Sequence, residues 1–377
     1  MNISEQLDHW VSANLIDQTT ADRILQFEIE ANKEGLRWPA LLAIGFGTLM
    51  LCAGILLFVA AHWDRLSPGQ RFALVLAMVA LFHLAAAALG RKSQSLSIAL
   101  HVAGTACLGA GVYMAAQIFN LEEHWPGGIM LWALGAVLAW LVLRQWPQAL
   151  LASVLIPWWL VGEWTVATEG YRGAWNIAAQ GLLLLAIFYV SASRQGTHSA
   201  LPLGLVWIGG LSLIPSIVIV ALSGESYGDW PTHSPFLPSS FTILGYAAAY
   251  VPVLALAFTT RKSRSLPMFG AAAWTAILGI MSRQPHAERN PAIYLLVGLG
   301  ACAFSYWGVR ENRKLFINLG TAIFAINVIT FYFSDVLDKL DRSLGLILLG
   351  ILFLAGGWFL NRVRSSLIAR TTSGASQ

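Results

Sequence analysis

The segment between Trp38 and Trp63 constrains the fold of this chain more than any other. It holds 24 consecutive residues without a charged side chain. At about 1.5 Å per residue, a helix of that length extends about 36 Å and crosses the hydrocarbon core of a bilayer. Tryptophan is enriched at the two bilayer interfaces, where this segment begins and ends. The segment therefore predicts a transmembrane helix.

Similar apolar runs recur along the whole chain. The sequence is 57% hydrophobic and only 11% charged, whereas a soluble domain has roughly 25% charged residues. Runs of about 20 apolar residues predict an all-α fold, a polytopic transmembrane helix bundle of about twelve spans. The expected spans are approximately residues 40–62, 71–89, 97–119, 129–143, 149–166, 174–192, 201–222, 240–259, 266–281, 291–309, 315–333 and 344–360.

The polar turn after the first span carries a helix-start signal. Ser67, Pro68 and Gln70 have the spacing of a capping box, with Ser67 as the N-cap, Pro68 at the first helical position and Gln70 reaching back to the cap. The second span is therefore expected to begin here and to form a hairpin with the first.

Residues 1–37 are polar enough to lie outside the membrane. Capping-box spacing at Asn2 and Glu5, and a second helix start at Thr19 and Asp22, predict a short cytoplasmic helical hairpin. So small a core does not fold alone, so we expect it to pack on the membrane domain, a protein partner or a second copy of itself. An amphipathic lead-in to the first span is the alternative. The predicted parts are a hairpin (1–37), a transmembrane domain (38–361) and a flexible cytoplasmic tail (362–377).

The distribution of Lys and Arg predicts the orientation. With twelve spans, sixteen of the 23 basic residues lie in connections on the side of the N-terminus and seven on the other side. Because cytoplasmic loops carry the excess of basic residues, both termini are expected to be cytoplasmic. The basic residues are spread over many short loops, so they do not indicate nucleic-acid binding. The bilayer itself is the expected partner.

One block of sequence recurs at an offset of 170 residues. The segment from Arg91 to Leu96, RKSQSL, reappears from Arg261 to Leu266 as RKSRSL, and matches of Ala, Thr, Leu and Gly follow in both copies. The offset equals six predicted spans, which favours a parallel repeat of six plus six helices with halves 38–195 and 196–361. Chance matching among small and apolar residues is the alternative.

Polar residues gather near the outer ends of the first and third spans. Spacings of three and four on the third span place its polar side chains on one helical face, at the depth of the turn after the first span. They predict an externally open vestibule, because polar side chains in a membrane usually face the bundle or water; interhelical hydrogen bonds and head-group contacts are the alternative. The substrate-pathway candidates are His62, Asp64, Tyr113, Gln117 and Asn120.

Two histidines lie deeper in the apolar runs. By helical rise, His83 and His101 sit about 10 Å and 6 Å from the cytoplasmic ends of consecutive antiparallel spans, so their side chains can meet. Such a pair would suit a proton relay. The alternative is a neutral histidine bonded to a backbone carbonyl.

Small residues line one face of the first span and one face of the third. Spacings of four and seven residues let neighbouring helices approach closely. Packing is the expected role, although the same face would also suit a substrate path. These residues are Ala43, Gly47 and Gly54 on the first span and Ala106, Cys107, Ala110 and Gly111 on the third.

Motifs of known chemistry are missing from the sequence. There is no HExxH, GxSxG or phosphate-loop pattern, and no pair of carboxylates in the middle of a span. His62, Asp64 and His124 are metal ligands by type but lack diagnostic spacing. We therefore expect no catalytic residues, no metal and no cofactor, and the protein is more readily interpreted as a non-enzyme.

The N-terminal part of the chain resembles a family of bacterial membrane proteins catalogued as domain of unknown function family 2157. The resemblance covers roughly residues 7–146. It rests on the hairpin ending near Ile29, the first-span end AAHWD (60–64), and GAG (109–111) leading to AQIFN (116–120). Relatives more often have Asn at the position of His62. The family implies a bacterial inner membrane but supplies no catalytic residues.

Two functions from different classes remain open. The first is a transporter or flippase-like protein that passes a small polar or amphiphilic solute. The second is a non-transporting scaffold, assembly or sensor protein that recruits a partner through residues 1–37. An intramembrane enzyme is a weaker third.

Overall fold

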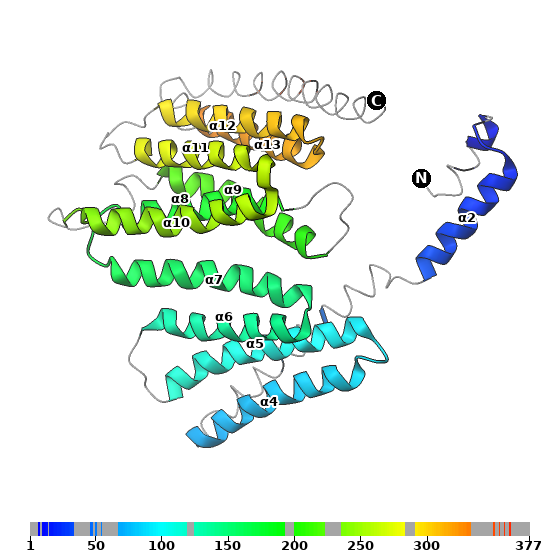
Figure 1. Cartoon of the computed structure of the whole chain (residues 1–377), viewed down its shortest axis with the longest axis horizontal. Helices are drawn as coiled ribbons and strands as arrows, with labels where there is room; N and C mark the ends of the chain where they lie inside the picture. Colours follow the sequence, from blue (N-terminus) through cyan, green and yellow to red (C-terminus); the bar gives the residue numbers. More distant parts are fainter. Residues whose placement is uncertain are drawn as a thin grey trace. The chain divides into compact units, whose positions relative to one another are not determined.

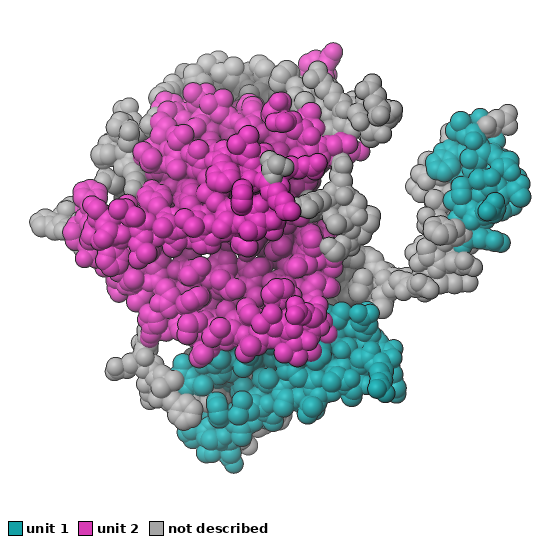
Figure 2. Space-filling model, viewed as in Figure 1, with its two compact units in different colours: residues 1–123 teal, residues 124–377 magenta. Residues whose placement is uncertain are grey.

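The computed structural model describes residues 10–13, 15–33, 67–118, 124–192, 200–222, 235–282 and 291–332, together with a few isolated positions. Its regular structure there is helical, and an isolated bridge between Arg172 and Phe236 is the one β contact among these residues. The chain divides into two compact units, residues 1–123 and 124–377 (Figure 2). The predicted domain boundaries at residues 37, 195 and 361 stay predictions.

The first unit contains α2 (Gln18–Lys33), α4 (Pro68–Leu89) and α5 (Gln94–Ile118). The α4 helix begins with the predicted capping box: the Gln70 amide N donates to Ser67 Oγ at 3.4 Å, and the Ser67 amide N donates to Gln70 Oε1 at 2.9 Å. A short turn joins α4 to α5, and the two helices pack on each other.

The second unit is a bundle of apolar helices (Figure 1). Its elements are α6 (Trp125–Leu143), α7 (Trp146–Ala167), α8 (Ala174–Val190), α9 (Ala200–Leu222), α10 (Ser239–Arg261), η2 (Lys262–Ser265), α11 (Leu266–Ser282), α12 (Pro291–Arg310) and α13 (Lys314–Phe331).

The α8 helix is the centre of this second unit. It packs against α7, α9, α10 and α11, and most of its residues are buried, including Leu183, Leu184 and Val190. A helix that is apolar on every side is expected in such an interior position. At Gly209 of α9 an added Cβ would lie 2.6 Å from both the Ala186 carbonyl oxygen and the Val190 amide nitrogen, so only glycine lets α9 approach α8 this closely.

The predicted helix bundle is confirmed. The ten expected segments from 71–89 to 315–333 coincide with α4 to α13, most of them to within three residues at each end. Among the described residues eight helices are long and apolar enough to cross a bilayer, and α8 and α11 are shorter apolar helices. The predicted spans 40–62 and 344–360 lie almost entirely outside the described residues. The total of twelve, the terminal tail and the internal repeat therefore stay predictions.

Candidate functional site

The predicted outer vestibule falls largely outside the described part of the chain. Tyr113 lies on α5 with 71% of its surface exposed, and Gln117 lies in the last turn of that helix. The structure describes neither the Gln117 side chain nor His62, Asp64 and Asn120. The vestibule stays a prediction.

The two deep histidines are brought together. His83 Nδ1 of α4 lies 2.9 Å from His101 Nδ1 of α5, with ring centroids 5.2 Å apart. A hydrogen bond between two ring nitrogens requires one protonated and one unprotonated nitrogen, so the pair shares a single proton at this contact. Gly104 makes room for it, because an added Cβ there would lie 2.8 Å from His83 Nε2. The proton relay itself stays a prediction.

The small residues of the third span fall on α5. Cys107 and Gly111 are buried, Cys107 in a cluster with Phe82 of α4, and an added Cβ at Gly111 would meet Val75 at 2.2 Å. Ala106 and Ala110 are half-buried. On the first span only Gly47 and Gly54 are described and Ala43 is not, so the packing role of that helix stays a prediction.

A buried polar network that the sequence analysis missed joins α8, α10 and α11. Asn176 Nδ2 donates to Ser282 Oγ at 3.0 Å, and Gln180 Nε2 donates to Asn176 Oδ1. The Tyr250 hydroxyl donates to Gln180 Oε1 at 2.9 Å and lies 3.0 Å from Thr275 Oγ1. The signal was present, since Asn176 and Gln180 stand four residues apart on one face of a predicted span.

Each of these side chains has a polar partner from the protein. Asn176, Gln180 and Thr275 are at most 1% exposed. Buried amides and hydroxyls that bond one another tie helices together, because an unpaired polar group in an apolar interior costs free energy. The network is therefore a structural element of the bundle.

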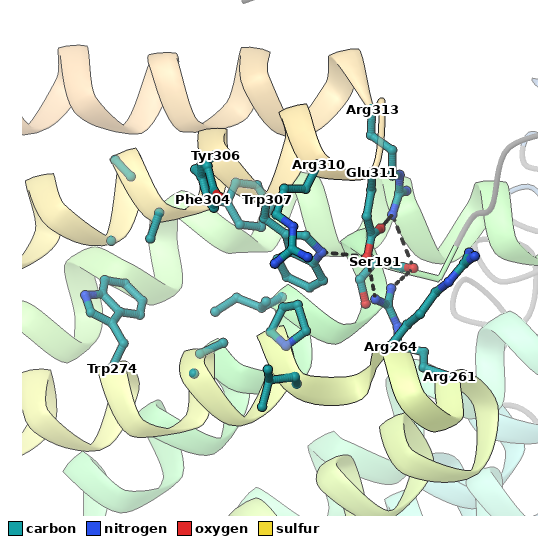
Figure 3. Close-up of a pocket in the computed structure, with 18 of the residues that line it drawn as sticks. Ser191, Arg261, Arg264, Trp274, Phe304, Tyr306, Trp307, Arg310, Glu311 and Arg313 are labelled. Atoms are coloured by element: carbon teal, nitrogen blue, oxygen red, sulfur yellow. Dashed lines mark hydrogen bonds and ion pairs between the residues drawn. The ribbon is translucent and has the colours of Figure 1, made fainter. Parts of the chain in front are cut away.

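At one end of the bundle, a large groove lies among α8 to α13 (Figure 3). It has a volume of about 1460 Å³. Its walls are apolar and aromatic, with Trp274 of α11 facing Phe304 and Trp307 of α12 across the space. Tyr306 and Leu299, which also line it, are 64% and 57% exposed, so the groove opens sideways along α12.

Five cationic residues and one carboxylate surround the mouth of the groove. The cations are Arg261, Lys262, Arg264, Arg310 and Arg313, and the carboxylate is Glu311.

Two of these cations are held by the protein. The Arg261 guanidinium donates to the Ser191 carbonyl oxygen, and Arg313 donates to the carbonyl oxygens of Ser191 at 3.3 Å and Val190 at 3.1 Å. These carbonyls end α8, where the helix dipole favours positive charge. Glu311 lies 3.6 Å from Arg261 and 3.8 Å from Arg313. We call Arg261 and Arg313 the inner arginines.

Aromatic rings complete the surroundings of the inner arginines. The Arg261 guanidinium carbon lies 5.3 Å from the Trp307 ring centroid and that of Arg313 lies 3.9 Å from the Phe316 centroid, both within cation–π range. Trp307 Nε1 donates to Glu311 at 2.6 Å. Burial lowers the pKa of Arg313 to about 10, which leaves it charged at neutral pH.

The remaining three cations, Lys262, Arg264 and Arg310, form an outer set. All three are exposed, and within the described residues none of their side chains makes a hydrogen bond or ion pair. The α10 helix ends at Lys262, where the positive φ of 50° turns the chain into η2. Lys262 and Arg264 of η2 and Arg310, the last residue of α12, all line the groove.

The groove was not predicted from the sequence, although part of its rim was visible. The run from Arg261 to Arg264 was identified as a repeat block and as an orientation signal. The basic residues of this run line the same groove as Arg310 because α11 packs against α12. The spacing of residues within one segment does not show which helices pack together.

Other titratable residues give weaker indications of a functional site. His124 Nε2 lies 2.7 Å from Glu163 Oε2, and Trp159 Nε1 donates to Glu163 Oε1. His124 and Glu163 are both partly exposed. Across the described ranges no three His, Cys, Asp or Glu side chains converge as metal ligands would.

Comparison with known proteins covers the N-terminal part of the chain. No curated protein and no solved structure matched. One family model matched residues 8–149, a stretch that ends before the groove begins at Ile187. Over these residues the chain matches the family described as "Predicted membrane protein (DUF2157)", which confirms the family resemblance found in the sequence.

Proposed function

We propose that this protein binds a membrane amphiphile with an anionic head in the groove of α8 to α13 and passes it between leaflets in a flippase-like manner. The observation that carries the proposal is an apolar, laterally open groove lined by three exposed cations whose side chains make no hydrogen bond or ion pair with the described residues. Apolar walls suit a hydrocarbon tail, and the rim suits a negatively charged head.

The size of the groove supports an elongated ligand. Pockets for compact small molecules measure about 300–1,000 Å³, and this groove reaches about 1460 Å³. Leu299 and Tyr306 are exposed on α12, a helix long and apolar enough to face lipid. A tail could therefore enter from the side, without first passing through water.

The position of the rim supports access from the inner leaflet. In the orientation predicted from the Lys and Arg count, the rim lies at the cytoplasmic face of a bacterial inner membrane, with both termini on the same side. Basic residues at that face attract anionic head groups.

Transport is tested in liposomes that contain a fluorescently labelled anionic lipid and a membrane-impermeant quencher of the label. The wild-type protein is expected to speed the arrival of inner-leaflet label at the outer surface. Equal rates with and without protein would reject passage between leaflets.

A substitution in the groove tests whether transport takes place through it. Gly270 of α11 lines the groove, and an added Cβ there meets nothing within 4 Å. Gly270→Leu should fill the groove without a clash and slow transport. Gly210→Leu on α9 is the matched control, because that glycine has equal space but does not line the groove. Equal slowing by both variants would contradict the assignment of the groove.

A further inference from the structure

We infer that the head of the groove's ligand is a phosphate monoester or diphosphate on a lipid, held by Lys262, Arg264 and Arg310. The inference rests on the proposed function and specifies the ligand class. Its first support is that two of the five cations at the mouth are bonded to the protein and the other three are exposed.

The inner arginines are already occupied. Arg261 and Arg313 bind the carbonyl oxygens at the end of α8 and share Glu311. Their removal would leave those carbonyls and that carboxylate without charged partners. The inner arginines therefore have a structural role at the mouth, and the outer set is the part of the mouth that can bind a ligand.

The net charge of the mouth favours one class of lipid head group over the others. Five cations against one carboxylate leave four positive charges in excess, three of them on the outer set. A zwitterionic head brings no net charge and a phosphate diester brings one. A phosphate monoester carries about −1.5 to −2 at neutral pH, and a diphosphate carries more, so these heads complement the outer set best.

The donor groups of the outer set suit phosphate oxygens. A guanidinium presents five N–H donors in a planar fork that binds phosphate bidentately, and an ammonium adds three. Arg264 and Arg310 supply two such forks from different elements, η2 and α12, and Lys262 of η2 lines the same groove. Phe304 and Trp307 provide the apolar wall at the same mouth, so a lipid with its phosphate on the rim keeps its tail in the groove.

The test is photo-crosslinking at position 270 of the full chain in phosphatidylcholine nanodiscs. A benzophenone amino acid replaces Gly270, and the discs contain dioleoyl phosphatidate, dioleoyl phosphatidylglycerol or dioleoylglycerol. Mass spectrometry of the adducts should show phosphatidate captured most, phosphatidylglycerol less and dioleoylglycerol least. The three lipids share their tails, so the order reports the head alone.

The triple variant Lys262→Gln/Arg264→Gln/Arg310→Gln should lower phosphatidate capture about tenfold or more, the effect of losing roughly 1.4 kcal/mol of binding free energy. Its capture of dioleoylglycerol should not change. Arg91→Gln/Lys92→Gln is the matched control, since this exposed pair has the same sequence context in the first unit and should leave capture unaltered.

The failures are distinguishable. Equal capture of phosphatidate and dioleoylglycerol, or an unaffected triple variant, would overturn the phosphate inference while groove binding stands. The absence of any lipid adduct at position 270 would reject the proposed function as well. Calorimetric titration with inorganic phosphate in neutral detergent separates the two sources of phosphate: binding as tight as that of phosphatidate would assign the site to a soluble anion and overturn the lipid inference.

Discussion

The polar network and the mouth of the groove lie at opposite ends of α8 and differ in how their polar groups are paired. Near the start of α8, Asn176 bonds to Ser282 and Gln180 bonds to Tyr250, which in turn bonds to Thr275. At its end, the inner arginines bond to backbone carbonyls, whereas the side chains of the outer set make no hydrogen bond or ion pair with any residue that the structure describes. Polar groups that satisfy one another hold helices together, whereas exposed cations that line an apolar groove keep their N–H donors open to an anionic ligand.

The α11 helix allows the sharpest test of this contrast, because it carries one glycine in each region. An added Cβ at Gly279 would lie 2.0 Å from Gln180 Nε2, and Gln180 is fully buried. Gly279→Leu should therefore destabilise the protein by about 3 kcal/mol. Gly270→Leu, the same change in open space, should leave the thermal midpoint in detergent nearly unchanged. Equal midpoints for the two variants would show that the network does not hold α11 in place.

The network should also respond to the loss of one amide. Gln180→Leu keeps the volume but removes the acceptor of Tyr250 and the donor to Asn176. We expect a loss of about 2 kcal/mol, because buried groups are left unpaired. Tyr250→Phe added to Gln180→Leu should cost less than the sum of the two single changes. Strict additivity in a double-mutant cycle would contradict a direct coupling.

The inner arginines should show a smaller, pH-dependent effect. Burial lowers the pKa of Arg313 to about 10, and the same burial would hold the pKa of a lysine at this position below its ordinary value of about 10.4. In the variant Arg313→Lys the unfolded chain then holds its proton to higher pH than the folded protein does. Stability of the variant should rise from pH 7 to pH 9.

The wild type is the control for that measurement, because Arg313 keeps its charge through most of this range. At pH 7 the variant should be about 1 kcal/mol less stable than the wild type, since lysine cannot bind both carbonyls as a guanidinium does. Parallel curves of stability against pH for the two proteins would argue against a buried cation at this position.

The sequence predicted the helices well because the length and the caps of a helix depend on residues that are contiguous in the chain. The apolar runs located α4 to α13, and Ser67 with Gln70 located the start of α4. The meeting of His83 with His101 followed from helical rise alone, since α4 and α5 are neighbours in sequence and joined by a short turn.

The network and the groove could not be predicted in the same way. Gln180 bonds to Tyr250, 70 residues further along the chain on α10, and Tyr250 in turn bonds to Thr275 on α11. Arg310 lines the same groove as Lys262 and Arg264 because α11 packs against α8 and α12. Such convergence is set by which helices pack together, and among runs of Ala, Leu and Gly many pairings bury similar apolar surface.

The outer set should contribute least to stability, and that is the closest test of the contrast between the two ends of α8. Exposed cations without partners contribute little to folding, so the triple glutamine variant should stay within about 0.5 kcal/mol of the wild type. Removing like charges that repel one another could even stabilise it slightly. Thermal unfolding in neutral detergent, without anionic lipid, provides the measurement. A loss approaching that of Gln180→Leu would mean that Lys262, Arg264 and Arg310 support the fold, and the two ends of α8 would then not differ in kind.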